Sequence, residues 1–531
     1  MKSSFVADAW SLARAAGLVA AVALAAAAPA RAAPAKGLAC MEAYDLACAR
    51  AELSDGEDGP SARLRAEIAF AEGRFGEAAA LFEKAKAAFS SPEVAAERAR
   101  LARATADVTA GMNLERRGDV EVRWAPGVDA VLVDEAVETL QAAHDRIGAL
   151  LGGAPPAPIR LEIYPSGDAF TTASGLPASA VQTTGVVALS KWNRLLVTSP
   201  RALARGYAWR DTLAHEYIHL VVAWRTRNLA PVWLQEGIAR SHESMWRSDA
   251  PAPLQPQAQS LLATALADDT LVPLARMHPS MAYLDSADEA ALAFAQVSTM
   301  VEHLRDRAGA DAVSRALDRV RDGADALDAV TAVAGDPTTD QFMQSWRASL
   351  AKMSLIRRKL EAAPTVLGAA SDEYGVDPVL SKRRDLTGHA RLGDLLRLAQ
   401  KHDAALIEYG RAMPEDEPPS PLIVARAAES LVALGRVDEA VMRLEASIAD
   451  YPEVPATRKA LAVLFLARGR ARDALNHFRA AADINPFDPS VQTALADLHA
   501  SFGARELAAR HARYARVLAL GGEDPTSGAS R

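Results

Sequence analysis

Glycines recur every 34 residues in the last third of the chain, at Gly435, Gly469 and Gly503. An alanine follows each glycine five positions later, and prolines share the spacing at Pro452 and Pro486. A glycine allows a tight turn between two helices, a small alanine lets those helices approach closely, and a proline ends the second one. The period therefore predicts that this third of the chain folds as a stack of helix pairs.

This pattern resembles the tetratricopeptide repeat (TPR), which implies an array over residues 387–520 with a concave groove for a protein partner. A packing scaffold without a ligand is the alternative. A fourth, degenerate unit is expected over residues 390–414, with Lys401 at the glycine position. Gly73, Ala78 and Phe82 repeat the same offsets near the start of the chain. Residues 33–112 are therefore expected to be a helical, TPR-like segment.

The pattern changes between the two helical blocks. Residues 120–124 and 159–164 are rich in β-branched or alternating apolar residues, which is typical of strands. Residues 133–151 between them have helical spacing, and residues 186–198 predict a hairpin with Trp192–Arg194 at its tip. From Trp209 to about residue 355 the chain again has the pattern of helices. We expect an α+β fold that is mostly helical, with a small mixed sheet in the middle and TPR-like helices at both ends.

Residues 215–219 read His-Glu-Tyr-Ile-His, a match to the pattern H-E-x-x-H. On a helix, His215 and His219 leave the same face, and that spacing suits two ligands of one zinc ion. Glu216 can then reach a zinc-bound water as a general base. A surface helix with two unrelated histidines is the alternative, but the neighbouring residues are apolar, and buried histidines and a buried glutamate need partners.

A third ligand is available on the next predicted helix, which Pro231 opens. Glu236 lies 17 positions after His219, and an antiparallel neighbouring helix can return its carboxylate to the metal. A solvated glutamate is the alternative for Glu236 taken alone. H-E-x-x-H followed by Trp-Leu-Gln-Glu-Gly-Ile-Ala at residues 233–239 resembles the gluzincin metallopeptidases, in particular the peptidase MA-like domains, over residues 113–355.

The resemblance implies one Zn²⁺ per chain, with His215, His219 and Glu236 as ligands and Glu216 as the catalytic base. Two positions depart from the family pattern. Arg240 stands where an acidic residue is frequent, and Phe294 stands where a tyrosine is frequent. Candidates for the carboxylate that orients a ligand histidine are Asp211 and Glu243. Candidates for stabilising an oxyanion are Tyr283, Tyr207 and His242.

The first 32 residues have the layout of a secretory signal peptide: two basic residues, an uncharged apolar run of about 14 residues, and Ala30-Arg31-Ala32 as a cleavage signal. A membrane anchor is the alternative, although about 20 apolar residues are needed to span a bilayer. We expect a periplasmic or secreted protein without a membrane span in the mature chain. Export to an oxidising compartment predicts a disulfide between Cys40 and Cys48, with two buried free thiols as the alternative.

The expected function is that of an exported zinc metallopeptidase that hydrolyses a protein or peptide substrate and uses its repeats for recruitment. The alternatives are an inactive zinc-bound scaffold that acts through its repeats, and a zinc hydrolase with a non-peptide substrate. Nucleic acid is not an expected partner, because 59 basic residues face 67 acidic ones. Residues 356–386 are expected to form a linker, and residues 521–531 a disordered tail.

Overall fold

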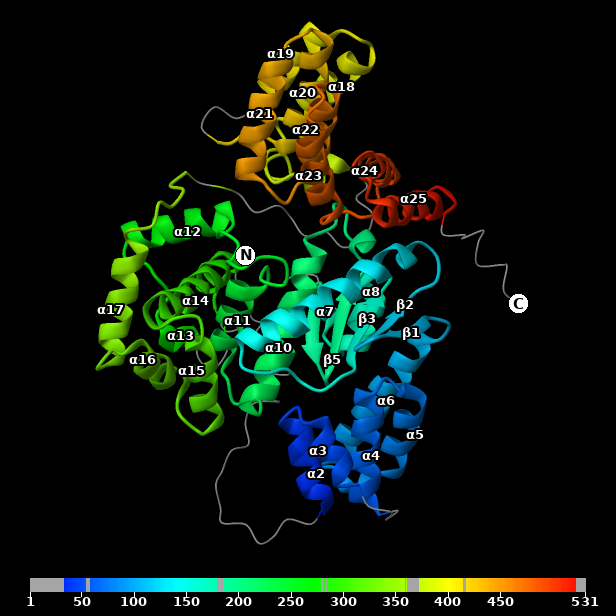
Figure 1. Ribbon diagram of the computed structural model, residues 1–531, viewed down its shortest axis with the longest axis vertical. Coiled ribbons are helices and arrows are strands. Elements are labelled where there is room, and N and C mark those ends of the chain that lie inside the picture. Colours follow the sequence, from blue (N-terminus) through cyan, green and yellow to red (C-terminus); the bar gives the residue numbers. More distant parts are fainter. Residues whose placement is uncertain are drawn as a thin grey trace, which may run out of the picture.

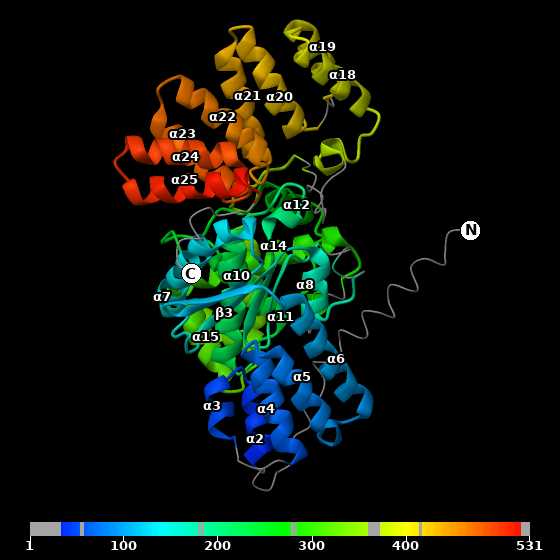
Figure 2. The ribbon, with the colours of Figure 1, turned by 90° about the vertical axis from the view of Figure 1, so that its right-hand side faces the viewer.

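A computed structural model describes residues 33–521, apart from residues 54–57, 179–180, 182–184, 278–280, 282–283, 359, 361–371 and 414–416. The predicted signal peptide and most of the predicted tail lie outside the described residues. The described chain has three parts (Figure 1). The N-terminal helices and the C-terminal helix pairs lie at opposite ends of a central domain that contains the sheet (Figure 2).

The N-terminal part is helical, as expected. The fragment that shares the repeat pattern forms a helix pair: Gly73 adopts a φ of +76° in the turn, and Ala78 and Phe82 are fully buried. Cys40 and Cys48 form a disulfide, as predicted, and join the first two helices. The elements are α2 (Ala33–Glu42), α3 (Leu46–Ala51), α4 (Gly59–Ala71), α5 (Phe75–Lys84), η2 (Lys86–Ala88) and α6 (Pro92–Thr109).

The central sheet is mixed and has the strand order β1-β2-β3-β5-β4. Its inner pairs, β2 with β3 and β3 with β5, are parallel, whereas the two outer pairs are antiparallel. The predicted hairpin is present, and its turn is only two residues, Trp192 and Asn193, both with positive φ. The strands are β1 (Asn113–Arg117), β2 (Val120–Trp124), β3 (Ile159–Tyr164), β4 (Ala188–Lys191) and β5 (Arg194–Thr198).

Helices cover this sheet and continue into a layer of their own. One apolar core runs from Val120 in the sheet to Leu350 in the last helix of the domain. The helices are η3 (Val128–Leu132), α7 (Val133–Leu150), α8 (Gly167–Ser174), η4 (Pro200–Ala202), α10 (Trp209–Thr226), α11 (Val232–His242), α12 (Pro256–Ala267), α13 (Leu274–Met277), α14 (Ala287–Ala308), α15 (Ala312–Arg321), α16 (Ala326–Ala334) and α17 (Thr339–Leu350).

The C-terminal part is the predicted stack of helix pairs. Gly435, Gly469 and Gly503 adopt φ values between +73° and +76° in the turns of three pairs. In the first pair, the residue with a positive φ is Gln400 rather than Lys401, so the degenerate unit turns one residue earlier than predicted. The pairs are α18 (Thr387–Leu398) with α19 (His402–Arg411), α20 (Pro421–Ala433) with α21 (Val437–Asp450), α22 (Pro455–Ala467) with α23 (Ala471–Ala482), and α24 (Pro489–Ser501) with α25 (Arg505–Ala519).

The segment predicted as a linker is packed where it is described. It contains a short helix, η6 (Glu373–Val376), and Tyr374 and Leu380 contribute to the core of the first helix pair. Asp377 is 3% exposed and accepts hydrogen bonds from the Ser420 hydroxyl and from backbone N–H groups. A search of the described helices finds none that is both long and apolar enough to cross a bilayer.

Candidate metal centre

Helix α10 carries the H-E-x-x-H residues deep in the central domain. His215 and Glu216 are 8% and 7% exposed, and α10 packs against α7, α11, α15 and the strand β4. The helix ends where Arg227 and Asn228 both adopt left-handed conformations, and Pro231 then precedes α11. This sharp reversal returns the chain antiparallel to α10, as the position of Pro231 predicted.

Helix α11 presents Glu236 toward the two histidines, and Gly237 sets how closely it packs. A Cβ atom at Gly237 would lie 2.7 Å from the carbonyl oxygen of Val297 and 3.0 Å from a methyl group of Val301, both on α14. A side chain at this position would therefore push α11 away from α14 and move Glu236 with it. The Glu-Gly pair of the motif thus combines a candidate ligand with the contact that positions it.

The side chains of His215, His219 and Glu236 converge on one point. The two Nε2 atoms are 3.1 Å apart, and the Glu236 carboxylate oxygens lie 3.4 Å from Nε2 of His215 and 3.6 Å from Nε2 of His219. All their ligand atoms lie within 4.8 Å of one another. Zinc–nitrogen bonds of about 2.0–2.1 Å in a tetrahedral site separate ligand atoms by about 3.3 Å. Two imidazoles and one carboxylate at these separations therefore fit a zinc ion.

Of the two carboxylates considered for orienting a ligand histidine, Glu243 is the one that contacts His215. Nδ1 of His215 lies 2.8 Å from Oε2 of Glu243, which leaves Nε2 directed at the point of convergence. The other candidate, Asp211, accepts hydrogen bonds from Trp246 and Arg247 instead. Glu243 is seven positions after Glu236, about two helical turns further along the chain. It reaches His215 only because α10 and α11 cross at this point.

Burial and nearby charges shape the electrostatics of this group. Burial raises the pKa of Glu216 to about 7, against the opposing effects of His215 and a hydrogen bond from the Ser190 backbone. Burial lowers the pKa of His219 to about 4, which favours the neutral imidazole that a metal requires. Burial alone would raise the pKa of Glu236, but attraction by both histidines lowers it to about 2, so this carboxylate is ionised.

The three candidates for an oxyanion donor have different surroundings. Tyr207 lies near Glu216, but its hydroxyl donates to the carbonyl of Thr198 at 2.6 Å. His242 is 1% exposed, and its Nδ1 lies 3.0 Å from the carbonyl of Ile238. Tyr283 lies outside the described residues. Tyr207 and His242 therefore already have hydrogen-bond partners within the protein.

The outer edge of β4 faces Glu216. Within the described sheet β4 pairs only with β5, and the backbone of Ser190 donates a hydrogen bond to Glu216 from the other side of the strand. An exposed strand edge can accept an extended peptide through backbone hydrogen bonds. The predicted hairpin edge therefore lies beside the predicted base.

Among the described residues, His215, His219 and Glu236 form the group of three that could hold a metal ion. Of the histidines that the sequence left unassigned, His278 lies outside the described part. Several of the others contact polar or aromatic partners: His144 with Tyr217, His303 with Ser345 and Phe342, His389 with Glu408, and His499 with His511.

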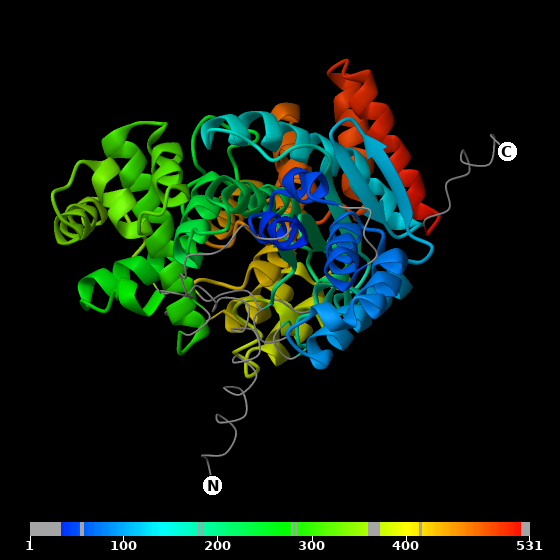
Figure 3. The ribbon, with the colours of Figure 1, turned by 90° about the horizontal axis from the view of Figure 1, so that it is seen from below.

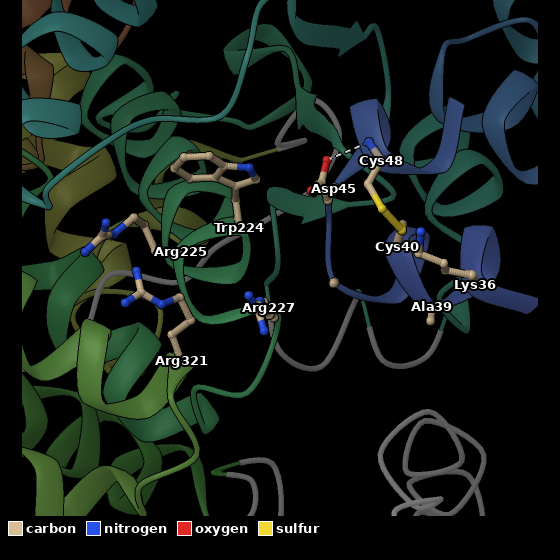
Figure 4. Close-up of a pocket in the computed structure, with 10 residues that line it drawn as sticks. Lys36, Ala39, Cys40, Asp45, Cys48, Trp224, Arg225, Arg227 and Arg321 are labelled. Carbon is tan, nitrogen blue, oxygen red and sulfur yellow. Dashed lines mark hydrogen bonds between the residues drawn. A yellow bond between two sulfur atoms is a disulfide. The ribbon is translucent and has the colours of Figure 1, made fainter. Parts of the chain in front are cut away.

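A separate cleft of about 450 Å³ lies at the opposite end of α10 (Figure 4). Trp224, Arg227 and the Cys40–Cys48 disulfide line it, together with other basic residues. Arg225 donates to the carbonyl of Gly152 and to Asp318. Basic residues at a helix C-terminus are favourable to the helix dipole, so this cationic lining needs no ligand to explain it.

Comparisons with known proteins agree with the domain organisation. Residues 139–352 match the Peptidase MA superfamily, and residues 431–498 match the tetratricopeptide repeat. The chain thus contains a peptidase MA domain and TPR repeats, which confirms both resemblances seen in the sequence. No curated protein matches the chain at a significant level.

Three solved structures show partial similarity to the chain. Leukotriene A4 hydrolase from Saccharomyces cerevisiae is 12% identical, with a TM-score of 0.29 over 77% of this chain and 67% of that one. MamA is 12% identical, with a TM-score of 0.24 over 26% of this chain and 81% of that one. Yeast Tom70 is 12% identical, with a TM-score of 0.18 over 92% and 89%. Because these TM-scores are below 0.5, the assignment rests on the two family matches.

Proposed function

We propose that this chain is an exported zinc metallopeptidase that cleaves peptide bonds and uses its TPR repeats to recruit a substrate or partner protein. The observation that carries the proposal is the convergence of His215, His219 and Glu236, with Glu216 beside them and Glu243 behind His215. The Peptidase MA match over residues 139–352 supports the same reaction class. The Cys40–Cys48 disulfide supports export, because such bonds persist in oxidising compartments.

In this proposal each residue has a defined role. A zinc ion, when bound by His215, His219 and Glu236, supplies a Lewis acid that polarises a carbonyl and lowers the pKa of a water. Glu216 takes a proton from the attacking water and delivers it to the leaving amine. Glu243 holds His215 in the required tautomer and orientation. The free edge of β4 aligns the substrate backbone next to Glu216.

Metal content is the first test. The mature chain, residues 33–531, is compared with a His219→Ala variant by elemental analysis. We expect about one zinc per wild-type chain and a large loss in the variant, because a site with two ligands binds zinc weakly. Failure of the wild-type chain to bind zinc after reconstitution would exclude the enzyme and leave a repeat-based binding protein.

Activity is the second test, with a mixture of unrelated peptides as substrates and Glu216→Gln as the matched control. The variant keeps the zinc ligands but lacks the base, so cleavage should fall by at least about 100-fold while zinc content is unchanged. The alternative is an inactive zinc-bound scaffold, which Phe294 favours because it offers no hydrogen-bond donor. Zinc binding without cleavage of any peptide would support that alternative.

A further inference from the structure

Arg240 places a cation at the rim of the metal centre. It lies four residues after Glu236 on α11, so both side chains leave the same face of the helix. Its side chain is 49% exposed, whereas those of Glu236 and Glu243 are 19% and 24% exposed. The guanidinium therefore reaches from the buried ligands to solvent, where a substrate would enter.

The contacts of Arg240 leave it able to take another anion. Its Nη1 atom is 3.5 Å from Oε2 of Glu243, which is longer than the roughly 2.7–2.9 Å of a strong charge-assisted hydrogen bond. Its guanidinium carbon lies 5.8 Å from the centre of the Phe294 ring on α14, within the range of a cation–π contact. A guanidinium has five N–H donors in a planar fork that matches a carboxylate.

Arg240 also determines the charge of the centre. The carboxylates of Glu216 and Glu236 lie beside the point of convergence and that of Glu243 lies behind His215, and Arg240 is close enough to act electrostatically on all three. With Zn²⁺ bound and all three carboxylates ionised, Arg240 makes the formal charge zero. A neutral residue at this position would leave the loaded centre negative, and it would repel an approaching carboxylate.

We propose that Arg240 recognises a carboxylate of the substrate, so that the preferred substrates are peptides with an anionic group next to the scissile bond. This inference rests on the proposed peptidase function and names its substrate class. The carboxylate belongs either to the C-terminus of the peptide or to an aspartate or glutamate side chain. The guanidinium lies between Phe294 and Glu243 and is half-exposed, so a carboxylate of the substrate can reach its free N–H groups.

The test compares matched peptides in the wild type, Arg240→Gln and Arg240→Lys. One set has the same sequence with a free or an amidated C-terminus, and a second set exchanges Asp and Glu for Asn and Gln. The wild type should prefer the anionic member of one set, which identifies the source of the carboxylate. Arg240→Gln should lose about 10- to 100-fold in kcat/KM for that member only, the range of a lost charge-assisted hydrogen bond. Arg240→Lys should recover part of the loss.

A binding measurement separates this inference from the proposed function. Calorimetry with the Glu216→Gln protein, with and without the Arg240→Gln change, measures peptide affinity without cleavage. The anionic peptide should bind more weakly after the change, while the neutral peptide should not. Arg276→Gln is the matched control, because Arg276 is another half-exposed arginine of the same domain, paired with Asp285 and Glu289.

Three results would overturn the inference. The first is equal affinity of the wild type for both members of each peptide set. The second is an equal loss of affinity for neutral and anionic peptides in Arg240→Gln, and the third is a similar loss of affinity in Arg276→Gln. An equal loss confined to kcat would instead assign Arg240 to stabilising the transition state. If no peptide is cleaved, the proposed peptidase function fails, and the calorimetric comparison still decides whether Arg240 binds carboxylates.

Discussion

The two helical modules are attached to the central domain by different chemistry. At the N-terminal end, Arg194 of β5 is fully buried, pairs with Glu162 at 2.6 Å and lies 4.7 and 4.6 Å from the rings of Phe70 and Phe75. Trp192 packs on Phe70 with ring centres 5.0 Å apart. This interface is desolvated, so salt in the solvent screens it little.

At the C-terminal end the charges are closer to solvent. Asp134 at the start of α7 accepts from Arg513 and from the Tyr514 hydroxyl, and Glu138 pairs with Arg510. The side chains of Arg513 and Glu138 are 43% and 48% exposed. α25 contacts η3 and the start of α7, and Figure 3, which views the molecule from below, shows the red helices α24 and α25 on the side opposite the green helices that end the central domain. The N-terminal helices are thus attached through a buried cation between aromatic rings, whereas the last repeat adds half-exposed ion pairs to the buried contacts of Tyr514 and Val517 with the central core.

The largest effect should come from removing the buried cation at the N-terminal interface. Arg194→Met removes the cation that pairs with the Glu162 carboxylate, which is 3% exposed and is left with the hydrogen bond from the Tyr164 hydroxyl. Loss of one member of a buried ion pair costs about 3–5 kcal/mol. Urea unfolding should show a loss of this size for the single variant. The double variant Arg194→Met/Glu162→Gln should recover much of it, since no buried charge then remains; equal losses in both would contradict this account.

The second prediction concerns pH at the C-terminal interface. Burial raises the pKa of Glu135 to about 7, and the charged groups that act on it are Arg210, Asp483, Arg510 and Glu138. A carboxyl with a raised pKa binds its proton more tightly when folded. Its contribution to stability is therefore complete below about pH 4.5 and is lost as the pH rises through about 7.

Glu135→Gln should remove this loss, so the variant should be more stable than the wild type by about 3 kcal/mol at pH 8 and nearly equal to it at pH 4.5. Unfolding by urea at a series of pH values measures the difference. Glu138→Gln on the same helix is the control, because its half-exposed side chain should give a much flatter difference. A difference at pH 8 no larger than that of the control would show that Glu135 is solvated.

The third prediction concerns a backbone contact between the central domain and the repeats, which the substitution Gly206→Ala should disrupt. The backbone N–H of Tyr207 donates to the carbonyl of Ile484 at 3.0 Å, in the loop between α23 and α24. A Cβ atom at Gly206 would lie 2.1 Å from the same oxygen. Gly206→Ala should therefore separate the loops and cost about 1–3 kcal/mol beyond the strain of a positive φ.

Gly435→Ala is the matched control for that strain. Its φ is +76°, against +75° at Gly206, and a Cβ atom there would meet no atom within 4 Å. Thermal unfolding of the two variants isolates the contact, and limited proteolysis should cut between the central domain and the repeats only in Gly206→Ala. Equal stability of the two variants would mean that Ile484 can move away freely.

The smallest effect should come from the exposed pair at the rim of the C-terminal interface. Arg510→Gln removes the contact with Glu138, and such half-exposed pairs contribute about 0.2–1 kcal/mol. The loss should disappear in 1 M salt, where the Debye length is about 3 Å. The effect of Arg194→Met, measured in the same two salt concentrations, should remain. Similar salt dependence at both sites would remove the distinction between the interfaces.

Local patterns predicted more of the molecule than contacts between distant segments could. The helix pairs, the hairpin and the antiparallel return of Glu236 follow from glycines, prolines and apolar spacing within a few tens of residues. Strand β1 was missed, because Asn113–Arg117 is polar and largely exposed and gains its structure by pairing with β2. Arg194 was expected only as part of a hairpin tip, since nothing near it in sequence indicates that Phe70 and Phe75 would cover it.

In the candidate centre, too, local spacing predicted the residues but not the contacts between distant segments. His215, Glu216, His219 and Glu236 are identified by spacing along two adjacent helices. Glu243 could be named only as one of two candidates, because its contact with His215 depends on how α10 crosses α11. The contact between Asp134 and Arg513 joins residues 379 positions apart and leaves no signal in the local pattern.

The close approach of α11 and α14 has a consequence for genetic data. Gly237 contacts no substrate or metal in the proposed reaction, yet every side chain larger than hydrogen would collide with the backbone of Val297. A saturation screen scored by activity would find this position as intolerant as the ligands on either side of the centre. A parallel score for protein abundance would separate the two causes. Substitutions at Gly237 should lower the amount of folded protein, whereas substitutions at Glu216 should remove activity and leave the amount of protein unchanged.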